Sequence, residues 1–213
     1  MKKTLTDTSP AIRHLMERDR RLAKVIRRIG PLTYDTDREP YAFLVHEIIE
    51  QMLSIRAGWT IYGRVEALCG GAVAPEAMAR LTEDDLRAAG VSRRKASYLL
   101  DLTEAVRSGA LDLSALPAMT DEEVKRTLTA FRGVGSWTAK MVLLFVLDRP
   151  DILPVEDAAF LQAWQWLYKS PDRSAAAVEK KCRKWRPYSS AAARYLYRAR
   201  DLGFLREPFH LYK

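Results

Sequence analysis

The stretch from Leu128 to Asp157 constrains the fold more than any other part of the chain, because it places a glycine hairpin between two helical patterns. Gly133 and Gly135 interrupt segments whose apolar residues recur at helical spacing. Two glycines this close allow positive φ angles and let another molecule approach the bare backbone. The pattern predicts a helix, a tight hairpin and a second helix.

The two flanking helices have recognisable ends. Thr120 and Glu123 have the spacing of a capping box, which predicts a helix over Asp121–Thr129. Ser136 is expected to cap a second helix, from Trp137 to Leu147. Amides at a helix start attract anions, so the hairpin is predicted to hold phosphates of a nucleic-acid backbone without reading sequence. An ordinary glycine cap between two packed helices fits the same spacing.

Two carboxylates, Glu156 and Asp157, lie at the predicted start of a helix over Ala158–Tyr168. An aspartate at this place is most often a simple N-cap. The same position also projects a carboxylate out of a helix end, toward whatever the hairpin holds. Both interpretations stay open from the residues alone.

Helical periodicity covers most of the remaining chain. One helix is predicted from Ser9 to Ile29, and Pro40 opens another that ends near Gln51. A third begins at Ser92, and the basic residues Arg93 to Lys95 in its first turn either contact phosphate or are simply exposed. Because strand-like alternation is lacking, the fold is predicted to be all-α.

The charge of the chain suits a polyanionic partner. Its 213 residues include 35 Lys and Arg against 27 Asp and Glu, a formal net charge of +8. A solvated basic surface without any nucleic-acid role explains the same balance. Cys69 and Cys182 are too few for a disulfide scaffold or an iron–sulfur cluster, which indicates a reducing cytoplasm. We find no targeting segment, no membrane-length apolar run and no cluster with divalent-metal spacing.

Four motifs in order resemble the helix-hairpin-helix DNA glycosylases, and in particular the 3-methyladenine DNA glycosylase II (alkylpurine) branch. The hairpin motif is FRGVGSWTAK at Phe131 to Lys140, followed by PVEDAAF from Pro154. The other three motifs are LVHEIIEQMLSIR from Leu44, LRAAGVSRRKASYLL from Leu86 and WRPYSSAAARYLY from Trp185. The resemblance covers nearly all of the chain.

The resemblance implies a single glycosylase module of two helical lobes with the active-site cleft between them. One lobe is expected to comprise residues 1–40 and 155–213, and the other residues 41–154 with the hairpin at 128–147. The partner implied is double-stranded DNA containing damaged bases, bound by a monomer.

The implied reaction is hydrolysis of the N-glycosidic bond of alkylated purines such as 3-methyladenine and 7-methylguanine. The base is flipped out of the duplex, and an abasic site is left. Asp157 matches the catalytic aspartate, with Glu156 as the rival carboxylate. Trp137 and Tyr197 match aromatic residues of the base pocket, and Met141 lies in that pocket where some relatives have a tyrosine.

The DNA contacts implied by the resemblance fall into two groups. Met52, with Gln51 beside it, matches the wedge that fills the gap left by the extruded nucleotide, although helical spacing also fits Met52 as a core residue. The phosphate-binding hairpin comprises Arg132, Gly133, Val134, Gly135, Ser136 and Thr138.

The implied ions and cofactors are few. The family hairpin holds a monovalent cation, Na⁺ or K⁺, and the carbonyls expected to bind it here belong to Thr129, Phe131 and Val134. The resemblance implies no catalytic metal and no required cofactor.

Two other functions stay open. A bifunctional glycosylase with lyase activity needs a lysine where this chain has Trp137, so the tryptophan favours a monofunctional enzyme. A non-catalytic helix-hairpin-helix DNA-binding module would keep the hairpin without needing Asp157.

Overall fold

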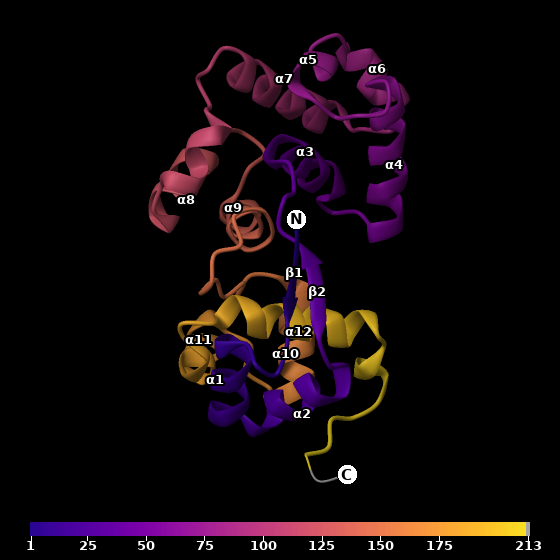
Figure 1. Ribbon diagram of the computed structural model, residues 1–213. Helices are drawn as coiled ribbons and strands as arrows, with labels where there is room; N and C mark the ends of the chain where they lie inside the picture. Colours follow the sequence, from indigo (N-terminus) through magenta and orange to yellow (C-terminus); the bar gives the residue numbers. More distant parts are fainter. Residues whose placement is uncertain (212–213) are drawn as a thin grey trace. The chain divides into compact units, whose positions relative to one another are not determined.

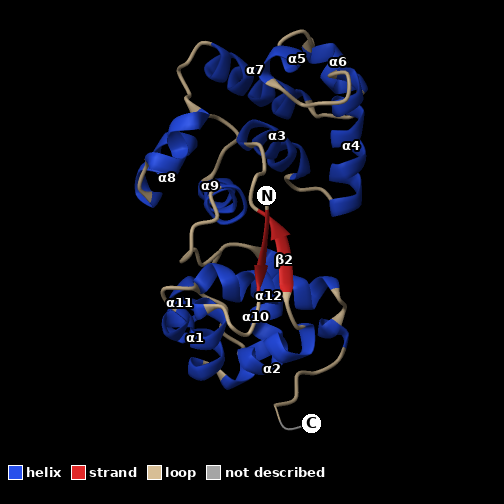
Figure 2. Ribbon diagram, in the orientation of Figure 1, coloured by secondary structure: helices blue, strands red, loops and turns tan. Residues whose placement is uncertain are grey.

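The computed structural model describes residues 1–211 and confirms the all-α class. Helices dominate both of the compact units into which the chain divides (Figures 1 and 2). The first unit combines Met1–Asp37 with the chain from Asp148 onward, and the second is Arg38–Leu147. Every helix of the described chain falls short of the apolar length that a bilayer crossing requires.

The first unit is built around a buried aromatic core. Trp164, Trp185 and Phe160 are almost completely buried in it. Its helical and strand elements are β1 (Lys2–Leu5), α1 (Pro10–Arg18), α2 (Arg20–Ile29), β2 (Leu32–Asp35), α10 (Ala158–Tyr168), α11 (Ala175–Cys182), η3 (Arg183–Trp185), α12 (Ser189–Asp201) and η4 (Phe204–Arg206).

A two-stranded antiparallel sheet is an addition to the predicted all-α fold. β1 pairs with β2 so that Lys2 lies opposite Asp35 and Leu5 opposite Leu32 (Figure 2). Each strand has four residues, too few for alternation to stand out in the sequence. Leu5 and Leu32 are buried, so the pair closes one side of the core.

The predicted helix from Ser9 to Ile29 is wrong as a single element, because the chain breaks at Asp19. The Asp19 side chain accepts hydrogen bonds from the amides of Arg21 and Leu22 and so caps α2. Its second oxygen accepts the Tyr168 hydroxyl and the Trp185 indole N–H. Burial alone would raise the pKa of Asp19, but these hydrogen bonds outweigh burial and hold the pKa below its ordinary value.

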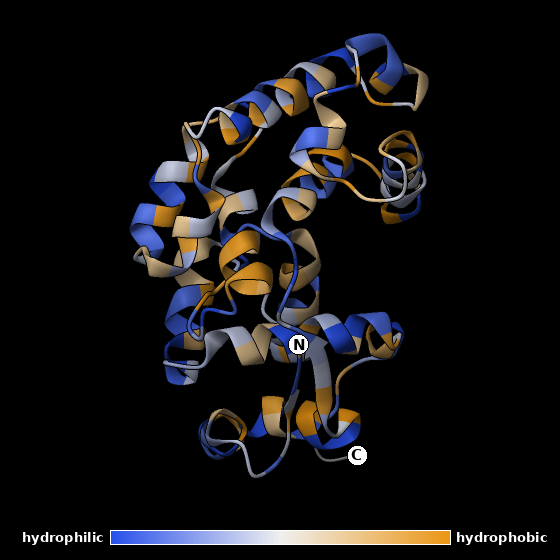
Figure 3. Ribbon diagram, turned by 45° about the horizontal axis from the view of Figure 1, so that its top comes forward, coloured by the Kyte–Doolittle hydropathy of each residue, from blue (hydrophilic) through white to orange (hydrophobic). Residues whose placement is uncertain are grey.

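The second unit contains the hairpin. Its elements are α3 (Pro40–Glu50), α4 (Ile55–Leu68), α5 (Pro75–Met78), α6 (Glu83–Ala88), α7 (Arg93–Arg107), η1 (Leu113–Ala118), α8 (Asp121–Thr129), α9 (Ser136–Met141) and the π-helical η2 (Val142–Val146). Hydrophilic and hydrophobic residues alternate in bands along most of the helical ribbons, as amphipathic helices require (Figure 3).

Local capping signals set several helix ends of this unit. The capping box of Thr120 and Glu123 is present at the start of α8, as predicted. Pro40 is the first residue of α3, also as predicted. The expected Ser136 cap is wrong, because Gly135 is the N-cap and Ser136 is already the first helical residue. The helix predicted from Trp137 to Leu147 begins one residue earlier, at Ser136, and continues as a π-helix from Val142 to Val146.

Candidate functional site

The hairpin between α8 and α9 is a tight turn in which one glycine is conformationally required. Gly133 has φ 89°, in the left-handed region that favours glycine. Gly135 has φ −93° and ψ 178°, which other residues also adopt. The amide of Val134 donates to the carbonyl of Phe131 at 3.1 Å and closes the turn.

A second turn packs directly against this hairpin. Ser92 caps α7, and Tyr98, on the next turn of that helix, lies over Gly133. A Cβ on Gly133 would stand only 2.6 Å from Cδ2 of the Tyr98 ring. The absence of a side chain at Gly133 is what allows the two turns to meet.

The surface formed by these two turns is basic and polar. The exposed Arg132 is paired with Asp101, with Nη2 at 2.5 Å from the carboxylate, and Arg94 donates to the Tyr98 hydroxyl. Ser136 is exposed at the start of α9, whereas Thr138 is only 1% exposed. We therefore leave the Thr138 side chain out of the proposed phosphate contact.

Gln51 and Met52 lie at the rim of the same surface. α3 ends at Glu50, and Met52 follows with φ 59° and is 101% exposed, which excludes the interpretation of Met52 as a core residue. Gln51 turns back to the hairpin and donates from Nε2 to the carbonyl of Gly133 at 2.8 Å. A groove of about 750 Å³ runs between the Met52 turn, the start of α7 and the hairpin.

Asp157 is the N-cap of α10, which confirms the capping interpretation. Its Oδ1 accepts the amide of Phe160 at 2.6 Å, and the residue is 9% exposed, whereas Glu156 is exposed. The cap fixes the direction of the carboxylate without excluding a catalytic role, because a preorganised charge is what electrostatic catalysis needs.

The three residues assigned to a base pocket belong to two units. Trp137 is half-buried in the first turn of α9, and Met141 is 3% exposed at its end. Tyr197 is half-buried on α12 of the other unit, with its ring 6.4 Å from that of Phe160. That these residues and Asp157 serve one extruded base stays a prediction.

The structure also reveals a group of potential metal ligands that sequence reasoning missed. His46, Glu47 and Glu50 on α3 place ligand atoms within 4.8 Å of one another, and burial raises the pKa of Glu50. The two imidazole nitrogens of His46 each lie 3.4 Å from a different glutamate. The His-Glu-x-x-Glu spacing on one helix is the signal that could have found them. The monovalent cation expected at the hairpin carbonyls stays a prediction.

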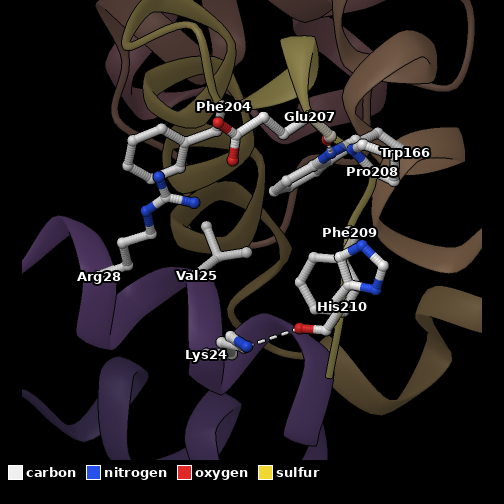
Figure 4. Close-up of a pocket in the computed structure, with 9 residues that line it drawn as sticks. All are labelled: Lys24, Val25, Arg28, Trp166, Phe204, Glu207, Pro208, Phe209 and His210. Atoms are coloured by element: carbon white, nitrogen blue, oxygen red, sulfur yellow. Dashed lines mark hydrogen bonds between the residues drawn. The ribbon is translucent and has the colours of Figure 1, made fainter. Parts of the chain in front are cut away.

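A separate hollow of about 370 Å³ lies in the first unit, beneath its C-terminal segment (Figure 4). The Arg28 guanidinium lies 3.9 Å above the Phe204 ring, and Lys24 donates to the carbonyl of His210. The Trp166 indole N–H donates to the carbonyl of Glu207 at 2.7 Å. None of the predicted site residues lines this hollow.

The chain belongs to the HhH-GPD superfamily of base excision DNA repair proteins, whose family model matches residues 45–187. The match includes the Met52 turn, the hairpin and Asp157. It confirms the family that the four sequence motifs indicate.

Individual relatives narrow this membership to one branch. The crystal structure of a DNA-3-methyladenine glycosidase from Bacillus halodurans is 36% identical with a TM-score of 0.84, covering 98% of this chain and 97% of that one. A Schizosaccharomyces pombe 3-methyladenine DNA glycosylase in complex with abasic DNA is 27% identical with a TM-score of 0.83, covering 91% and 97%. A Bacillus subtilis protein named for DNA-3-methyladenine glycosylase activity is 34% identical over 76% of this chain, which spans 60% of the length of that relative.

Proposed function

We propose that this protein is a monofunctional DNA glycosylase that removes cationic alkylated purines, of the 3-methyladenine and 7-methylguanine type, from double-stranded DNA. The observation that carries the proposal is the match to the Bacillus halodurans DNA-3-methyladenine glycosidase along almost the whole length of both chains. The complex of the Schizosaccharomyces pombe relative with abasic DNA supports DNA as the partner and an abasic site as the product.

The hairpin is the proposed grip on the DNA backbone. Gly135 caps α9 with no side chain in the way, so the first amides of the helix offer donors and a positive dipole end to a phosphate. Arg132 adds a positive charge on the same surface. A net charge of +8 favours this electrostatic, sequence-independent binding.

Met52 is the proposed wedge. Extruding a nucleotide costs a few kcal/mol of stacking and pairing, and an apolar side chain inserted between base steps offsets part of this cost. A fully exposed, unbranched Met52 on a tight turn is suited to that task.

Asp157 is the proposed catalytic carboxylate. Cleavage of the N-glycosidic bond develops positive charge on the sugar, which a fixed carboxylate stabilises while it orients a water molecule. The alkylated base carries a positive charge of its own, so the faces of Trp137 and Tyr197 attract it. A tryptophan at position 137 has no amine to attack the sugar, so strand cleavage is not expected.

The test is base release from duplex DNA carrying a single 7-methylguanine, followed with and without a subsequent alkaline strand-cleavage step. The protein should release the base and leave strands that break only in alkali. Asp157→Asn should lower the rate on the order of 10²-fold or more while duplex binding is kept. Glu156→Gln, which changes the adjacent carboxylate, is the matched control and should stay near the wild-type rate. Equal losses of base-release rate in the two variants would contradict the catalytic role proposed for Asp157.

A further inference from the structure

The turn that carries Met52 has a backbone that its own sequence does not favour. α3 ends at Glu50, Gln51 is its C-cap, and Met52 then takes φ 59°, which residues other than glycine rarely adopt. The amide of Leu53 donates to the carbonyl of Glu50 at 2.9 Å and closes the turn. An exposed side chain on such a backbone needs support from elsewhere in the fold.

That support comes from Lys95 in the first turn of α7. Its ammonium donates to the carbonyl of Ile49 at 2.8 Å and to the carbonyl of Gln51 at 2.5 Å. Ile49 lies in the last turn of α3 and Gln51 is its C-cap, where carbonyl acceptors are left without an intrahelical donor. Lys95 therefore fixes the peptide unit between Ile49 and Glu50 and the one between Gln51 and Met52.

The hairpin also supports the Met52 turn, through Gln51. Gln51 presents its main-chain carbonyl to Lys95 and its side-chain amide to the carbonyl of Gly133, at 2.8 Å. The residue before Met52 is thus held on one side by α7 and on the other by the proposed phosphate grip. All of these contacts lie inside the Arg38–Leu147 unit.

We propose that Lys95 is a positioning residue for base extrusion, which holds the Met52 turn in the conformation that enters the duplex. The inference rests on the proposed function, specifically on Met52 as the wedge. It gives Lys95 a role different from a phosphate contact, because two of the three N–H donors of its ammonium already bind the carbonyls of Ile49 and Gln51.

Arg94, the neighbour of Lys95 in sequence, is the matched control. Both are basic residues of the same helical turn, yet Arg94 is exposed and donates to the Tyr98 hydroxyl, whereas Lys95 is half-buried. Burial also lowers the pKa of the Lys95 ammonium below its ordinary value. A loss of surface charge at Arg94 should weaken DNA binding in general, and a loss of Lys95 should affect only steps that need Met52.

The experiment compares single-turnover release of 7-methylguanine from two substrates. In one the lesion is fully paired within a duplex, and in the other it has no opposing nucleotide and is already partly unstacked. Lys95→Met, which removes the ammonium but keeps most of the side-chain length, should slow release from the paired duplex about tenfold, equivalent to about 1.4 kcal/mol, and release from the unopposed lesion less than about twofold. Lys95→Arg should restore most of the rate, because a guanidinium also donates to two carbonyls. Arg94→Met should affect both substrates equally.

A double-mutant cycle with Met52→Ala separates the inference from the proposed function. If Lys95 acts through the wedge, Lys95→Met should add less than about twofold in the Met52→Ala background. If Met52→Ala does not discriminate between the two substrates, the wedge assignment fails. If Met52→Ala does discriminate but Lys95→Met slows both substrates equally, or neither, the positioning role is overturned. Should Lys95→Met not fold, Lys95→Gln keeps a neutral amide donor and should show the same substrate preference with a smaller loss of rate.

Discussion

Replacing Gly133 with alanine is expected to destabilise the protein, because both the backbone and the surroundings of this residue exclude a side chain. Its φ of 89° lies in the left-handed region, where a Cβ costs ~1–2 kcal/mol. The new Cβ would also stand 2.6 Å from Cδ2 and 2.9 Å from Cγ of Tyr98. These atoms lie close to the backbone of α7, so the ring cannot simply rotate away, and such overpacking costs ~1–3 kcal/mol. The two effects together amount to ~2–5 kcal/mol.

Gly135→Ala is the control for this prediction. Gly135 has φ −93°, and a Cβ built on it meets nothing within 4 Å. Alanine is a poorer N-cap than glycine but loses less conformational entropy on folding, and these opposing effects leave a net change within ~1 kcal/mol. Gly133→Ala and Gly135→Ala add the same methyl group two residues apart in one turn. Only Gly133→Ala should substantially lower the free energy of unfolding.

Urea unfolding followed by tryptophan fluorescence and by far-ultraviolet circular dichroism measures both variants. A Gly133→Ala variant with wild-type stability would refute the reasoning. In a Tyr98→Ala background, Gly133→Ala should cost only the backbone part of the destabilisation, because the ring that the new Cβ would contact is gone. Duplex binding adds a second result: Gly135→Ala should weaken DNA affinity without loss of stability, since its methyl group stands where the phosphate is proposed to approach.

Three other substitutions or assays follow from the structure. Asp19→Asn should lower the free energy of unfolding at neutral pH by ~2–4 kcal/mol, because an amide cannot accept every buried hydrogen bond that the carboxylate accepts. The pKa of Asp19 is lower in the folded state than in the unfolded state, where it is ~3.9. The stability that Asp19 contributes is therefore complete above the unfolded-state pKa and is lost as pH falls through the folded-state pKa. The Asp19→Asn variant should accordingly lose less stability than the wild type as pH falls below about 4. Met52→Gly should raise stability by up to ~1 kcal/mol, through relief of the left-handed backbone, while slowing release from a paired duplex; unchanged release would argue against the wedge. Borohydride added during turnover should trap no covalent complex with DNA, because Trp137 stands where a lyase has its lysine; a trapped complex would identify a lyase.

The parts of the fold that were predicted correctly depend on residues close together in sequence. The capping box at Thr120, the proline that begins α3 and the helix after Asp157 are each set within one helical turn. Capping and proline geometry act over such distances, so the sequence alone contains the information.

The parts that were wrong depend on residues far apart. Asp19 ends one helix and starts the next while its carboxylate binds Tyr168 and Trp185, which lie 149 and 166 residues away. Periodicity around Asp19 reads as one continuous helix, because these partners are invisible in a local window. The contacts of Lys95 are equally invisible in a local window, since its acceptors at Ile49 and Gln51 lie 46 and 44 residues away.

The Met52 turn shows why a functional residue can look unremarkable in sequence and distinctive in structure. Helical spacing also fits a core residue at position 52, but the chain leaves the helix at Gln51 and exposes Met52 completely. A left-handed backbone on a residue other than glycine costs stability, and an exposed thioether gains no burial in return. Within the Arg38–Leu147 unit this arrangement has only a cost, and the contacts of Lys95 and Gln51 maintain it. Local strain that the surrounding structure actively supports is typical of a site whose stabilising contacts come from another molecule, and for this family that molecule is DNA.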